Sequence, residues 1–110
     1  MLTLPIKKKW FDLILSGEKK EEYREIKPYW TTRFKSIIGG YDFERFIIKG
    51  VSLNFTVRFQ NGYSPDSSSF DADVYLEKGT GKPEWGAKPK EEYYVLKIGK
   101  IYNVSLKGGV

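Results

Sequence analysis

Apolar and polar residues alternate most regularly between residues 51 and 59, where every second side chain is apolar. This period of two is typical of a strand that buries one face. Shorter apolar or alternating stretches, bounded by glycine, proline or charged residues, indicate further strands. We expect these strands at residues 2–6, 21–27, 43–49, 72–76 and 93–101.

Two segments carry apolar residues at helical spacing instead. Residues 8–16 place Trp10, Phe11 and Ile14 on one side, and Gly17 stands where a left-handed cap would end a helix. Residues 31–38 form the second predicted helix. We expect Trp10 and Phe11 to lie in the core, where truncation of a buried Trp to Ala costs about 3–5 kcal/mol.

These elements together predict an α+β protein that is mostly β. Several strands with few crossover helices favour a small, mainly antiparallel β-barrel of five or six strands with two short helices. Residues 60–69 and 79–90 are rich in Gly, Pro and polar residues and are expected to be surface loops. A length of 110 residues supports a single domain over residues 1–110.

The composition narrows the chemistry, because the chain contains no cysteine and no histidine. Disulfides, a thiolate nucleophile and cysteine-based zinc sites are excluded, and we expect neither a metal nor a cofactor. Any acid–base chemistry would depend on carboxylates, lysine or tyrosine with a shifted pKa. The first apolar stretch is too short for a signal or a membrane span, so we expect a cytoplasmic protein that binds no membrane.

The net charge of +5 is unevenly distributed along the chain. Residues 1–40 hold nine Lys and Arg against five Asp and Glu, a balance of +4, whereas residues 41–110 hold ten against nine, a balance of +1. A cationic face attracts phosphate and makes binding salt-dependent. The first third of the chain is therefore the predicted place for a polyanion, although a pI near 9.3 is also common among small proteins that bind no nucleic acid.

A densely charged segment at residues 17–24 follows the first predicted helix. Such a segment is often only a solvated connection between two elements. On a strand, however, Glu22 and Arg24 would share one face while Tyr23 points to the other. Lys19 precedes the strand, in the turn, so periodicity leaves its direction open.

The order Gly17-x-Lys19-x-x-Glu22-x-Arg24 resembles the G-x-K-x-x-E-x-R signature of the ASCH (activating-signal-cointegrator homology) domain, a relative of the PUA fold. The likeness is strongest over residues 2–38, which include Tyr29-Trp30-x-x-Arg33. A weaker likeness covers residues 82–86 and 93–101. The resemblance implies a PUA-like β-barrel whose cleft, lined by the motif, faces RNA or a nucleotide.

The resemblance and the side-chain chemistry together suggest roles for individual residues. Arg24 would contact phosphate or a base edge, and Glu22 would orient Arg24 or accept a base amino proton. Lys19 and Lys20 would supply charge to the backbone. Many RNA-binding modules stack unpaired bases on aromatic side chains, and Tyr29, Trp30 and Trp85 are the aromatic residues that we expect to stack on bases. Arg33 is the remaining candidate binding residue.

An enzymatic function is the alternative hypothesis to RNA or nucleotide binding. Some small members of the superfamily are amidohydrolases that remove the acetyl group of 4-acetylcytidine with a Lys in this motif, a Thr at the place of Glu22, and a further Glu. Lys19 matches the Lys, Glu22 departs from the Thr, and Glu77 and Glu84 are candidates for the third position. A ribonuclease using Lys19 and a carboxylate belongs to the same alternative, and a protein-interaction module is a third.

Overall fold

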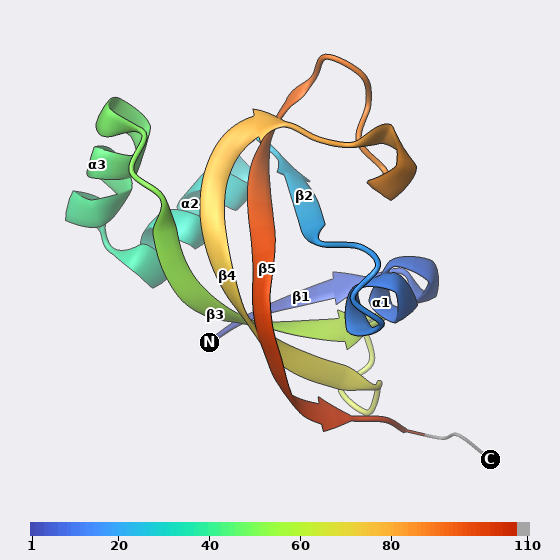
Figure 1. Cartoon of the computed structure of the whole chain (residues 1–110). Helices are drawn as coiled ribbons and strands as arrows, with labels where there is room; N and C mark the ends of the chain where they lie inside the picture. Colours follow the sequence, from blue (N-terminus) through green and yellow to red (C-terminus); the bar gives the residue numbers. More distant parts are fainter. Residues whose placement is uncertain (108–110) are drawn as a thin grey trace.

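The computed structural model describes residues 1–107, which form five strands, three α-helices and one 3₁₀ turn. The chain is thus α+β and mostly strand, as predicted (Figure 1). The elements follow in the order β1 (Leu2–Ile6), α1 (Lys8–Leu15), β2 (Glu21–Glu25), α2 (Pro28–Ile38), α3 (Gly40–Lys49), β3 (Leu53–Asn61), β4 (Ser69–Thr80), the 3₁₀ turn (Pro83–Trp85) and β5 (Glu92–Ser105).

The strands form one mixed sheet in the order β1-β3-β4-β5-β2. Strand β1 pairs parallel with β3, and the other three pairs are antiparallel. Long, strongly curved strands bend the sheet on itself (Figure 1). Within residues 1–107, β1 and β2 remain edge strands that do not pair with each other, so the closed barrel predicted from the sequence is not confirmed.

The main hydrophobic core lies where the three α-helices pack against the sheet. Phe11 and Ile14 of α1 and Phe34 of α2 are buried there, which confirms the helical spacing of both predicted helices. Alternation also holds in the sheet, where Val57 and Phe59 are fully buried. No helix within residues 1–107 has the length and apolarity needed to cross a membrane.

The predicted strand at residues 43–49 is wrong, because these residues belong to helix α3. Phe43 and Phe46, three positions apart, are the residues this helix buries, whereas Ile47 and Ile48 are exposed. Gly50 ends the helix in the left-handed conformation, with φ 66°. A short apolar run that includes two β-branched residues suits a strand and a helix equally well, and only the spacing of the two phenylalanines separates them. Residues 1–107 therefore contain three α-helices instead of two.

Trp10 also departs from the prediction. Phe11 is fully buried as expected, but Trp10 is only half-buried and lies at the border of the core. One side of its indole packs on apolar neighbours, and the ring also lines a pocket on the surface. Its truncation should therefore cost less than the value for a fully buried Trp.

Candidate functional site

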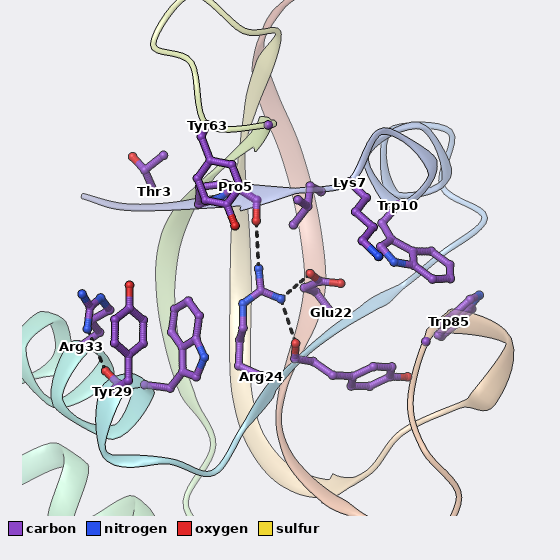
Figure 2. A pocket seen from close by; sticks show the side chains of 15 residues that line it. Thr3, Pro5, Lys7, Trp10, Glu22, Arg24, Tyr29, Arg33, Tyr63 and Trp85 are labelled. Atoms are coloured by element: carbon purple, nitrogen blue, oxygen red, sulfur yellow. Dashed lines mark hydrogen bonds and ion pairs between the residues drawn. The ribbon is translucent and has the colours of Figure 1, made fainter.

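A pocket of about 740 Å³ opens between the two edge strands of the sheet. Residues of β1, α1, β2 and α2 line it, together with Gly62 and Tyr63 from one loop and Trp85 and Gly86 from another (Figure 2). The curl of the sheet brings β1 and β2 toward each other, so segments that are distant in sequence contribute to one concave site. The charged motif supplies its central polar residues.

Three charged side chains of the motif are bonded to one another at the base of this pocket. Lys19 donates from Nζ to Oε1 of Glu22 at 2.6 Å, and Arg24 donates from Nη1 to Oε2 at 2.5 Å. Lys19 is 1% exposed and Glu22 is 5% exposed. One carboxylate is therefore shared by two cations, which leaves the trio with an excess of positive charge.

The backbone explains how these side chains converge. Glu22 and Arg24 lie two residues apart on β2 and share a face, as predicted, while Tyr23 packs on Tyr93 and Val95 on the other face. Lys19 follows a tight turn in which Gly17 has φ +85° and the Lys19 amide donates to the Leu13 carbonyl at 2.9 Å. This turn directs the lysine inward, which periodicity could not predict.

Arg24 also links the two edges of the sheet. Its Nη1 donates to the carbonyl of Tyr23 at 2.8 Å, and its Nη2 donates to the carbonyl of Pro5 in β1 at 3.4 Å (Figure 2). The guanidinium lies 5.1 Å from the ring of Trp30. Its side chain is 13% exposed, toward the pocket that it lines. Arg24 is thus held from several sides and still faces a space where a ligand could lie.

Lys19 is enclosed by aromatic rings in addition to Glu22. Its Nζ lies 4.8 Å from the ring of Trp10 and 5.4 Å from that of Tyr23. Burial lowers the pKa of Lys19 below its usual value, while the Glu22 carboxylate favours the ammonium form and acts in the opposite direction. The lysine does not line the pocket itself, so it supports Glu22 from behind.

Aromatic side chains form two facing walls. Trp10 and Trp85 lie on one side of Glu22 and Arg24, and Tyr29 lies on the other beside Arg33 (Figure 2). Several of these rings carry a cation: Arg33 at 3.3 Å from Tyr29, Lys9 at 4.7 Å from Trp10, and Lys82 at 4.6 Å from Trp85. The rim is therefore both aromatic and positively charged.

Two glycines fix the loop that carries Trp85. A Cβ on Gly81 would lie 2.7 Å from the Tyr23 ring, and one on Gly86, which has φ +100°, would lie 3.1 Å from Trp10. The hydroxyl of Tyr23 also accepts from the Lys82 amide at 2.9 Å and donates to Glu21 at 2.8 Å. Close backbone approach and these two bonds together seat the loop against β2 and α1.

Most of the residues predicted from the sequence meet in this pocket. Lys19 lies behind the lining residues, and Lys20 is exposed outside it. Sequence reasoning missed Trp10, whose helical spacing indicated the core, and Tyr63, whose loop carries no periodic signal. The predicted residues that line the pocket are Glu22, Arg24, Tyr29, Trp30, Arg33 and Trp85.

The polar groups of this site are one carboxylate and the donors of arginine and lysine side chains. Within residues 1–107, no group of three or more Asp and Glu side chains gathers in a way that could hold an ion. Comparisons with protein-family models, with curated proteins and with solved structures give no match to this chain. The evidence for function therefore lies in the pocket itself, which combines the Glu22 carboxylate as acceptor, the Arg24 guanidinium as a strong donor, and aromatic walls.

Proposed function

We propose that this chain is an ASCH-type domain that binds RNA or a nucleotide in the pocket between β1 and β2. The observation that carries the proposal is the buried trio, in which Glu22 is shared by Lys19 and Arg24 beneath aromatic walls. A PUA-like barrel architecture is part of the same proposal, in line with the strong curl of the sheet. The three charged residues of the signature are the residues that form the trio.

Each group in the pocket has a role that suits a nucleotide. Trp30 and Trp85 line the pocket, and aromatic side chains at such positions suit contact with a base, which has an aromatic face whatever its sequence. The Glu22 carboxylate would accept from an exocyclic amino group, and the Arg24 guanidinium would donate to a phosphate or a base edge. Lys20 and Arg33 would add charge outside the base site.

A binding experiment with a matched arginine control tests the proposal. Arg24→Ala should weaken binding of single-stranded RNA by about 1–3 kcal/mol, since a strong donor is lost. Affinity of the parent should also fall steeply with salt. Arg45→Ala is the control, because Arg45 lies on α3 and does not line the pocket. Titrations at two salt concentrations measure both effects, and equal, salt-insensitive affinity of parent and Arg24→Ala would remove the proposal.

A small amidohydrolase is the second candidate, supported by one observation. Burial lowers the pKa of Lys19, which favours the neutral amine that a lysine base requires. Two features oppose this function. Glu22 stabilises the ammonium form, and Lys19 lies behind the lining residues, where a substrate carbonyl would not reach its Nζ.

We therefore expect hydrolysis of 4-acetylcytidine to be slow or absent. Any activity should rise with pH, because the reactive form of Lys19 is the neutral amine. Release of cytidine, followed by chromatography across a pH series, measures this. Turnover at ordinary enzyme rates that is lost in a folded Lys19→Ala variant would rank the hydrolase first.

A further inference from the structure

Tyr63 stands apart from the other aromatic residues of the pocket. It lines the pocket, yet it is 89% exposed. In the view of Figure 2, Tyr63 overlaps Pro5 and lies beyond the guanidinium end of Arg24. Within residues 1–107 its ring has neither an aromatic partner nor a cation, whereas Tyr29 and Trp85 each have a cation on theirs. Its ring is thus open at the mouth of the site.

The loop that carries Tyr63 is nevertheless fixed to the sheet. The amide of Gly62 donates to the Ile6 carbonyl at 3.0 Å. Gln60 donates from Nε2 to the carbonyls on either side of Tyr63, at 2.9 Å to Gly62 and 2.8 Å to Ser64. Gly62 has φ +90°, a conformation that other residues rarely adopt. The backbone thus presents the tyrosine at a defined place on the rim.

From this arrangement we infer that Tyr63 forms a second base subsite, so that the ligand is a single-stranded oligonucleotide of two or more nucleotides. The inference rests on the proposed function and adds the length of the ligand to it. One base would occupy the inner pocket near Trp30, and the next would stack on the open ring of Tyr63. A duplex does not meet this requirement, because its bases are already paired and stacked.

The positions of the cations agree with a chain that crosses the rim. Lys7 lines the pocket on the side of α1, and Arg33 lines it on the side of α2. Phosphates on either side of the inner nucleotide would therefore each approach a basic side chain. A single nucleoside would leave Tyr63 and at least one of these cations without a partner. The inference thus predicts that affinity depends on ligand length.

Two probes and three tyrosine variants test the inference. Cytidine 5′-monophosphate, which has an exocyclic amino group for Glu22, reports on the inner pocket alone, and a tetracytidylate reports on both subsites. Tyr63→Ala should weaken binding of the tetracytidylate by about 5- to 150-fold, the effect of losing one base–aromatic stack, and should weaken binding of the mononucleotide by a clearly smaller factor. Tyr63→Phe should keep the affinity because it keeps the ring. Tyr41→Ala is the matched control, since Tyr41 is 77% exposed on α3 and does not line the pocket.

The outcomes separate this inference from the proposed function. Binding of both probes with equal affinity in the parent would overturn the second subsite while the nucleotide site stands. The same conclusion follows if Tyr63→Phe loses as much affinity as Tyr63→Ala, or if Tyr41→Ala behaves like Tyr63→Ala. A parent that binds neither probe, or an Arg24→Ala variant that binds both as well as the parent, would overturn the proposed function and the inference with it.

Discussion

Glu22 and Asp71 are both buried carboxylates that bind an arginine, but their charges are balanced in different ways. Asp71 is fully buried and accepts from Arg58 at 2.8 and 3.2 Å and from Asn103 at 3.0 Å, with the Arg58 side chain 46% exposed. Glu22 serves two cations, and both are largely buried. Asp71 does not line the pocket, whereas Glu22 does.

The difference makes the cluster at Glu22 the better candidate for a ligand site. At Asp71 one arginine neutralises one carboxylate and keeps access to water, so the pair is complete as it stands. At Glu22 one carboxylate pairs with two cations that have little access to water, so an incoming anion would neutralise the remaining positive charge. A buried ion pair alone is thus a poor sign of function, while an unbalanced one beneath a pocket is a better sign.

The largest expected effect on this comparison comes from neutralising the two carboxylates with isosteric amides. Glu22→Gln should destabilise the fold by about 3–5 kcal/mol, because Lys19 and Arg24 lose their shared counter-charge in a buried place. Asp71→Asn should cost less, about 1–3 kcal/mol, because Arg58 turns to water. Urea unfolding of the three proteins measures both values. A larger loss of unfolding free energy for Asp71→Asn than for Glu22→Gln would contradict the proposed difference between the two clusters.

The pH dependence of stability sharpens the same contrast. Hydrogen bonding from Arg58 lowers the pKa of Asp71 from the usual 3.8, so its contribution is present above 3.8 and is lost as pH falls through the folded-state value. Burial lowers the pKa of Lys19 from 10.5, so between the lowered folded-state pKa and 10.5 the unfolded chain holds a proton that the folded chain has released, and stability rises with pH over that window.

Two variants assign these effects to their groups. Asp71→Asn should flatten the loss of stability in acid and leave the alkaline range unchanged, whereas Lys19→Met should remove the alkaline rise and leave the acid range unchanged. Unfolding free energies across a pH series give both profiles. An alkaline profile identical in the parent and Lys19→Met would mean that the Glu22 carboxylate fully offsets the burial of Lys19.

The sequence allowed the elements around Glu22 to be predicted better than those around Asp71. Alternation on β2 placed Glu22 and Arg24 on one face, and helical spacing with Gly17 bounded α1. Arg58 meets Asp71 through the pairing of β3 with β4, and Asn103 meets it through the pairing of β4 with β5, where the register shifts twice and Asn103 has φ 52°. Local patterns do not encode such irregularities, since they arise from long-range pairing.

The same reason explains the other omissions. The inward turn of Lys19 depends on its backbone bond to Leu13, and the parallel pairing of β1 with β3 depends on the whole intervening chain. Tyr63 lies in a loop whose composition predicts only exposure, which is correct but does not place it beside the pocket. The charged residues of the site could be predicted from the motif, whereas the residues that lie beside them could be identified only from the fold.

Lys20→Ala should have the smallest effect and tests whether charge outside the trio contributes to binding. The Lys20 carbonyl accepts from the Ile98 amide at 2.9 Å, a backbone bond that the substitution leaves intact, and the side chain is exposed. Unfolding free energy should therefore stay within about 0.5 kcal/mol of the parent. If Lys20 contacts a phosphate, RNA affinity should fall modestly and the salt slope should decrease by about one. Titrations across a salt series against Arg24→Ala give the ranking. A loss of affinity as large as that of Arg24→Ala would move the main contact from the buried trio to the exposed surface, and the comparison with Asp71 would lose its functional meaning.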